Sequence, residues 1–285
     1  DPLWSRGLGD VYKRQAASGP KMISQNPQLQ VIKPATNAPI KAVTLVTHGF
    51  NLQPARLHEI VTELASLNHI VVQLTLTGHD GNYANLASVT RDIWLGDMQS
   101  ATLTAAALST EYRVPLIFVG ISLGALLNVD LLNQAVEPYF SKRVLIVPAI
   151  RLHWYTHLIR LLNLFPLASN VPSRSPASYR VHPQLPIAAY NAVFKSVAAT
   201  KILSKENLSI PTLIFSAPTD ELVSHRGLKN ILSHHPDASW QLISLNNSDS
   251  MVKPRFAHNC VDSASMGHSC WEMFLANLRQ FLESA

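Results

Sequence analysis

The stretch that decides the fold is residues 116–127, which read LIFVGISLGALL. The apolar run at its start is typical of a buried strand. Gly120 and Gly124 flank Ser122, and small and aliphatic residues follow at helical spacing. Glycine has no Cβ, so the chain can turn where a side chain would clash with the neighbouring strand or helix. The stretch therefore predicts a buried strand, a very tight turn with Ser122 at its tip, and a packed helix.

This layout is typical of a nucleophile elbow, in which a strained strand-to-helix turn lifts the serine oxygen above the sheet. The five-residue pattern alone is weak, because chance supplies roughly one match in ten chains of this size. Its strand-like and helix-like flanks make it informative. We interpret Ser122 as a nucleophile and the N–H of Leu123, at the helix N-terminus, as an oxyanion donor. The alternative is an ordinary turn with a bystander serine.

Composition indicates a globular protein. The 285 residues suffice for one large α/β domain, and 47% hydrophobic with 14% charged residues argues against disorder. The net charge of +5 is scattered and forms no basic helix face, so we expect no nucleic-acid partner. The longest apolar stretch, 115–127, is interrupted and shorter than the about 20 residues that span a bilayer. We therefore expect no transmembrane segment.

Residues 1–15 differ from the rest of the chain, since they show neither periodicity nor a helix cap. They resemble translated adapter or vector sequence, so we interpret them as a non-native or disordered tail. The domain is expected over 22–285, with Met22 as a candidate start. Cys260 and Cys270 are too few for a disulfide framework, although they could pair with each other. Two free thiols favour a cytoplasmic protein, and export stays open because the native N-terminus is not identified.

Strand-like and helix-like segments alternate along the first half of the chain. Strands are expected at 29–33, 41–47, 70–76, 115–121 and 143–147, and helices at 54–67 and 91–112. Alternation with nearly continuous apolar strands indicates a mostly parallel sheet covered by helices on both faces. Two further strands, 211–217 and 240–245, and a helix at 269–282 complete the chain.

A long segment at about 149–210 separates two of these strands. It is rich in proline and apolar residues, shows no clear strand, and has helix-like pieces at 153–165 and 188–203. A segment of this length inside a compact domain is usually functional. We therefore expect an inserted helical lid over a pocket for an acyl group, with transient contact to a lipid surface. The alternative is extra packing without substrate contact.

Two loops follow early strands. Strand 41–47 runs into His48-Gly49-Phe50, where folds with an elbow place the second oxyanion donor, and Gly49 lets the backbone approach the ester. The N–H of Phe50 is therefore our candidate. The later loop contains His79 and Asp80, with no third ligand spaced nearby. We expect these two residues to order the loop, and we expect neither a metal nor a cofactor.

Asp220 follows strand 211–217, and His258 lies in the polar loop after strand 240–245. A serine hydroxyl is a poor nucleophile near neutral pH. It needs an imidazole to accept its proton and a carboxylate to orient that imidazole. The order serine, Asp220, His258 supplies these groups, each after a separate strand.

Both assignments have alternatives. His268 adjoins the expected start of the last helix. His258 lies within the loop before that helix, and this loop can bring its imidazole back to Ser122, so we favour His258. Glu221 and Asp249 are the rivals of Asp220, whose position at the strand end favours it. The remaining histidines, His153 among them, are interpreted as surface residues.

With these residues in place, the chain resembles α/β-hydrolases of the serine aminopeptidase and monoacylglycerol lipase-like group. The resemblance covers roughly 41–282. Its features are His48-Gly49-Phe50, the Gly-His-Asp-Gly loop at 78–81, Trp94 with Asp97, the elbow at 120–124, Pro218-Thr219-Asp220 and a late histidine. The chain departs from the pattern at Ile121, where histidine is commoner, and in the long stretch before the late histidine.

The resemblance implies an α/β-hydrolase fold and a serine hydrolase without a cofactor. The expected substrates are carboxylic esters of small lipophilic, monoacylglycerol-like or lysophospholipid-like compounds, cleaved through an acyl-serine intermediate. The same groups act on thioesters and amides, so a thioesterase or peptidase is the alternative. An alternative of another class is a non-catalytic protein that binds a lipophilic ligand.

Overall fold

The computed structural model describes residues 28–36, 38–134, 140–164, 170–246, 249, 251 and 256–284. The tail at 1–15 and the candidate start Met22 lie outside the described residues. None of the described helices is both long enough and apolar enough to cross a membrane.

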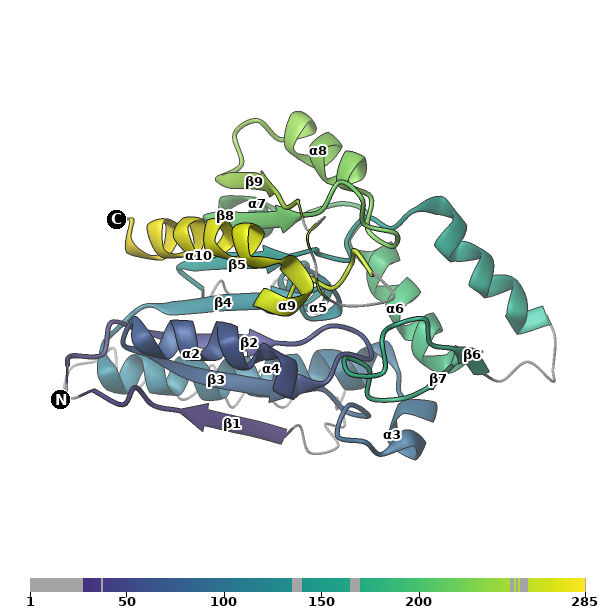
Figure 1. Cartoon of the computed structure of the whole chain (residues 1–285), viewed down its shortest axis with the longest axis horizontal. Coiled ribbons are helices and arrows are strands. Elements are labelled where there is room, and N and C mark those ends of the chain that lie inside the picture. The colour runs from purple at the N-terminus through teal and green to yellow at the C-terminus, as the bar shows by residue number, and fades with distance from the viewer. Residues whose placement is uncertain are drawn as a thin grey trace.

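A seven-stranded sheet forms the centre of the molecule, in the order β1-β3-β2-β4-β5-β8-β9 (Figure 1). The strands are β1 (Gln28–Ile32), β2 (Ala42–Thr47), β3 (His69–Thr75), β4 (Leu116–Ile121), β5 (Lys142–Ile146), β8 (Thr212–Ser216) and β9 (Trp240–Ser244). β1 pairs antiparallel with β3, and the other neighbours pair in parallel. The prediction of a mostly parallel sheet is confirmed, and the carboxyl ends of its parallel strands meet at one edge.

Helices cover both faces of this sheet. Figure 1 shows α2 (His58–Ser66) and α10 (His268–Glu283) in front of it, and α4 (Arg91–Tyr112) and α5 (Leu123–Leu132) behind it. Successive strand residues point to opposite faces, so Leu45 packs in the cluster with α4 and α5, and Val46 in the cluster with α2 and α10. Further helices are η1 (Pro54–Leu57), α3 (Tyr83–Ala87), α7 (Lys205–Ser209), α8 (His225–His234) and α9 (Ser263–Met266).

The chain between β5 and β8 contains η2 (Trp154–Leu164), β6 (Asn170–Pro172), β7 (Gln184–Pro186) and α6 (Ile187–Ala199). It lies at the edge toward which the parallel strands point (Figure 1). The expectation of no strand is wrong, because β6 and β7 form a two-stranded antiparallel sheet. Each is only three residues long and ends in proline, so neither carries the alternating pattern of a strand.

The two helical parts of this segment differ in their packing. The α6 side chains of Ala189 and Val193 are buried in the core cluster that also contains α5. By contrast, η2 exposes Trp154, Leu158 and Leu161. The segment is therefore partly built into the body of the domain, with an apolar helix left on its outside.

Candidate active site

Ser122 lies in a strained turn between β4 and α5. Its φ is 47°, in a region that residues other than glycine rarely adopt, at a cost of about 1–3 kcal/mol. Its N–H donates to the carbonyl oxygen of Ile146 at 2.9 Å, and the N–H of Gly124 donates to that of His48 at 3.1 Å. A Cβ on Gly124 would lie 2.6 Å from the carbonyl oxygen of Thr47. The second glycine is therefore required by the close approach of α5 to the end of β2.

The structure brings Ser122, His258 and Asp220 together. The Ser122 Oγ lies 2.8 Å from His258 Nε2, and His258 Nδ1 lies 2.7 Å from Asp220 Oδ2. The other carboxylate oxygen, Asp220 Oδ1, accepts the N–H groups of Leu222 at 2.7 Å and Val223 at 2.8 Å. With Nδ1 protonated toward the carboxylate, Nε2 is free to accept the serine proton.

The electrostatic setting of His258 suits a base. Its side chain is 11% exposed, and that of Asp220 is fully buried. Burial lowers the pKa of His258, but the charge and hydrogen bond of Asp220, together with the charge of Glu221, raise it above its ordinary value. The imidazole thus accepts a proton more readily than a free histidine side chain does.

The rival residues do not occupy these positions. His268 is the first residue of α10 and is exposed to solvent. Glu221 Oε1 accepts the backbone N–H of His258 at 3.4 Å and not its ring. Asp249 lies beside Gly267, where an added Cβ would approach the Asp249 carboxylate to 2.4 Å. His258 and Asp220 are the residues that form the hydrogen-bonded chain to Ser122.

The loop after β2 passes directly against the elbow. A Cβ on Gly49 would lie 3.3 Å from the Cβ of Ser122. The next residue in this loop is Phe50. On the other side of the serine, Leu123 is the first residue of α5, and the first amides of a helix have no acceptor within it. The two amides named from the sequence therefore belong to segments that flank Ser122.

His48 holds this loop in place, a role that the sequence analysis missed. Its Nδ1–H donates to the carbonyl oxygen of Gly49 at 2.9 Å, and its Nε2 accepts the N–H of Leu76 at 3.0 Å. Burial lowers the pKa of His48 to about 4, although the bond to Gly49 opposes the shift. The ring is thus neutral near pH 7, and it fixes the peptide whose N–H belongs to Phe50. The His48-Gly49 pair directly after a strand was the sequence signal that could have indicated this role of His48.

His79 and Asp80 order their loops, consistent with the expectation. His79 Nε2 accepts the N–H of Asn51 at 2.9 Å, and Asp80 Oδ1 accepts the N–H of Asn82 at 3.0 Å. Among the described residues, no group of three or more His, Cys, Asp or Glu side chains is placed to bind a metal. Cys260 and Cys270 are both buried, and they form no disulfide with each other.

Trp94 and Asp97 hold Thr77, which lies two residues before His79. The Trp94 Nε1–H donates to the carbonyl oxygen of Thr77 at 3.1 Å, and Asp97 Oδ2 accepts its N–H at 2.8 Å. Burial raises the pKa of Asp97 to about 6. These two α4 residues therefore fix the start of the loop that carries His79.

His153 was wrongly interpreted as a surface residue. It is half-buried, and its Nε2 lies 3.1 Å from the carbonyl oxygen of Asp220. Its ring stacks on Tyr155, whose hydroxyl donates to the carbonyl oxygen of Glu221 at 2.6 Å. The start of η2 thus supports the loop that presents the carboxylate. Nothing in the local sequence indicated this contact, because it joins segments far apart in the chain.

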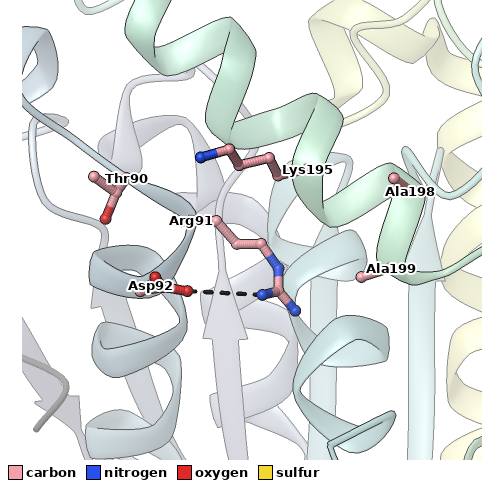
Figure 2. A pocket seen from close by; sticks show the side chains of 6 residues that line it. All are labelled: Thr90, Arg91, Asp92, Lys195, Ala198 and Ala199. Atoms are coloured by element: carbon pink, nitrogen blue, oxygen red, sulfur yellow. Dashed lines mark ion pairs between the residues drawn. The ribbon is translucent and has the colours of Figure 1, made fainter. Parts of the chain in front are cut away.

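Two cavities lie beside α6, and neither is lined by Ser122, His258 or Asp220. The larger, of about 460 Å³, is shown in Figure 2 and is lined by Thr90, Arg91, Asp92, Lys195, Ala198 and Ala199. The smaller, of about 230 Å³, shares Lys195 and Ala198 with it. Arg91 is ion-paired with Asp92 at 3.7 Å, and with the buried Asp130 at 2.7 Å. The pair with Asp130 ties α4 to α5.

The sheet, the elbow and the chain of hydrogen bonds from serine to carboxylate define an α/β-hydrolase. Residues 38–202, more than half of the chain, match the family model of the serine aminopeptidases, S33. The chain belongs to this hydrolase family, and the resemblance stated from the sequence is confirmed.

Solved structures agree with this fold. One, from work on LipS and LipT, two metagenome-derived lipolytic enzymes, is 21% identical with a TM-score of 0.68, covering 89% of this chain and 96% of that one. A soluble variant of monoglyceride lipase from Saccharomyces cerevisiae is 13% identical with a TM-score of 0.72, covering 93% and 95%. The monoacylglycerol lipase of Paleococcus ferrophilus is 12% identical with a TM-score of 0.60, covering 90% and 98%. No curated protein sequence matches the chain.

Proposed function

We propose that this protein is a serine hydrolase that cleaves carboxylic esters through an acyl-serine intermediate. The observation that carries the proposal is the unbroken chain of hydrogen bonds from Ser122 through His258 to Asp220, at 2.8 and 2.7 Å. This geometry matches the distances that proton transfer from a nucleophile to a base requires. Membership in a hydrolase family supports the same chemistry.

In the proposed mechanism, Ser122 Oγ attacks the ester carbonyl carbon while His258 Nε2 takes its proton. Asp220 stabilises the imidazolium that forms. The N–H groups of Phe50 and Leu123 bind the tetrahedral oxyanion. Collapse of this intermediate breaks the bond to the alcohol, which leaves with the proton from His258. A water molecule, activated by the same histidine, then hydrolyses the acyl-serine and restores the enzyme. The steps need no cofactor.

The proposed substrates are small lipophilic esters such as monoacylglycerols or lysophospholipids. Phe50, beside the elbow, makes edge contacts with Tyr190 at 5.3 Å and Trp94 at 6.0 Å between ring centroids. Phe50 is partly exposed in the loop that passes the nucleophile, and an aromatic side chain there favours an apolar acyl group. The monoglyceride lipases among the similar structures support this substrate class. We propose that the segment at 149–210 acts as the lid of this site.

A fluorophosphonate probe tests the nucleophile and the histidine together. We expect the wild type and His268→Ala to label at Ser122, and His258→Ala to label at least about 10³-fold more slowly, because the serine then lacks its base. Labelling is measured by intact mass, alongside turnover of short- and medium-chain p-nitrophenyl esters. The matched p-nitroanilides and thioesters separate an esterase from the alternative hydrolases. A folded wild type that neither labels nor turns over any of them would instead favour a non-catalytic binder.

We also propose that η2 contacts a lipid surface. Its side chains of Trp154, Leu158 and Leu161 are 75%, 52% and 53% exposed. Tryptophan and leucine on one outward helix favour insertion into the boundary between lipid headgroups and acyl chains. A lipid surface is the occupant that fits a lipophilic ester substrate, and the net charge of +5 favours anionic lipid.

Replacing Leu158 by serine is expected to weaken binding to phosphatidylcholine vesicles containing phosphatidylglycerol by about tenfold, from the loss of buried apolar area. Turnover of a soluble short-chain ester should not change. Leu103→Ser is the matched control, because Leu103 is 39% exposed on α4, away from η2. Co-sedimentation measures the binding. Equal losses in the two variants, or no loss in Leu158→Ser, would contradict the proposed lipid contact.

A further inference from the structure

One part of the inserted segment is fastened to the loop that carries the proposed oxyanion donor. We call residues 173–183 the strap. Within it, the carbonyl oxygen of Tyr179 accepts the N–H of Gln53 at 2.8 Å, and that of Ser178 accepts the Arg56 Nε–H at 2.7 Å. The Tyr179 hydroxyl also donates to Asp262, in the chain that follows His258, at 2.8 Å. The strap therefore joins the loop after β2 to the histidine loop.

Asn51 makes the most complete of these contacts. Its Nδ2 donates to the carbonyl oxygen of His182 at 2.9 Å and to Ser173 Oγ at 3.1 Å, and its Oδ1 accepts the N–H of His182 at 2.8 Å. Its carbonyl oxygen accepts the N–H of Val181 at 3.0 Å, and its own N–H donates to His79 Nε2 at 2.9 Å. All of its polar groups are thus bonded, and the residue is 3% exposed.

The backbone of Asn51 also has an unusual conformation. Its φ is 57°, in the left-handed region, which asparagine adopts more readily than other residues with a side chain. The Phe50 amide directly precedes this turn. On its other side, His48 bonds the carbonyl oxygen of Gly49. The Phe50 peptide is therefore held from both ends, by His48 before it and by Asn51 after it.

We infer that Asn51 is a positioning residue that sets the direction of the Phe50 N–H by clamping the loop to the strap. The inference rests on the proposed serine hydrolase function. Oxyanion donors accelerate a reaction only when they are fixed before the charge develops, so a loosened donor lowers the rate of the chemical step. The strap then acts as a fixed wall of the site, and a lid movement would be confined to other parts of the insertion.

The variant Asn51→Gly tests this inference, because glycine keeps the left-handed conformation and removes only the side-chain bonds. We expect kcat for p-nitrophenyl butyrate to fall by about 10- to 100-fold, less than the about 10²–10³-fold loss of a whole donor, with KM within about twofold. A trifluoromethyl ketone, which forms a tetrahedral oxyanion on the serine, should lose affinity by the same factor. Binding of the product butyrate should not change.

Gln53→Ala is the matched control. Gln53 Nε2 donates to the carbonyl oxygen of Arg180 at 2.9 Å, so this variant also removes a bond to the strap, but away from the Phe50 peptide. Its thermal unfolding should shift less than that of Asn51→Gly, because it loses one side-chain bond to the strap and Asn51→Gly loses three, while its kcat stays near the wild-type value. A kcat unchanged in Asn51→Gly, or lowered equally in both variants, would overturn the positioning role. A wild type without turnover would instead overturn the proposed function, and this inference with it.

Discussion

Replacing Ser122 by alanine is expected to lower kcat for ester hydrolysis by about 10⁶-fold. The hydroxyl oxygen is the proposed nucleophile, and His258 Nε2, 2.8 Å from it, accepts its proton during the attack. Alanine supplies neither the oxygen nor the proton. Without the acyl-serine path, only the oxyanion donors and substrate binding remain, and these give about 10³–10⁴-fold over water. Steady-state release of p-nitrophenol measures the loss, and intact mass should show no acyl adduct.

The variant should fold as the wild type does. Alanine at position 122 keeps the same strained backbone, and the N–H bond to Ile146 does not involve the side chain. Ser196→Ala is a matched control, since it removes a buried hydroxyl from α6. Its kcat should stay near the wild-type value. If Ser122→Ala kept more than a small fraction of the activity, the proposed role of the serine would be wrong.

The sheet and the elbow could be predicted from the sequence because their signals are local. The strand before Ser122 is buried along its whole length, so its sequence is a continuous apolar run. The glycines of the turn are required by contacts within a few ångströms, as at Gly124. Asp220 could be found from its place after a strand. Such features depend on short stretches of chain, so a pattern can identify them.

The proposed catalytic histidine was harder to predict, because His258 lies 13 residues after Leu245. No local sequence pattern shows which residue of so long a loop comes back to Ser122. Its place in a loop before the last helix favoured His258 over His268, and the structure brings the His258 ring to Ser122. The contacts of the strap could not be predicted at all. Asparagine at position 51 predicts only a turn, whereas its side-chain partners Ser173 and His182 are 122 and 131 positions away in the sequence. Only the folded arrangement shows that they meet.

Replacing Asp220 by asparagine is expected to lower kcat by about 10⁴-fold while leaving the fold intact. The amide Nδ2 can take the place of Oδ2, which accepts His258 Nδ1–H at 2.7 Å in the wild type. A donor there forces the proton of the imidazole onto Nε2, so the ring cannot accept the serine proton. The remaining amide oxygen still accepts the N–H groups of Leu222 and Val223, which maintains the loop.

The pH profile of the residual activity distinguishes this cause from a loss of structure. Asp220 raises the pKa of His258 through its charge and hydrogen bond, against the opposing effect of burial. Activity requires neutral His258, so it rises as pH rises through this pKa. Removing the charge lowers the pKa, and the acid limb of kcat/KM should therefore move to lower pH in Asp220→Asn. Glu221→Gln is the control, because Glu221 raises the same pKa less and does not contact the ring, so it should shift the limb slightly and keep most of the rate. Nearly normal turnover in Asp220→Asn with a large loss in Glu221→Gln would assign the orienting role to Glu221.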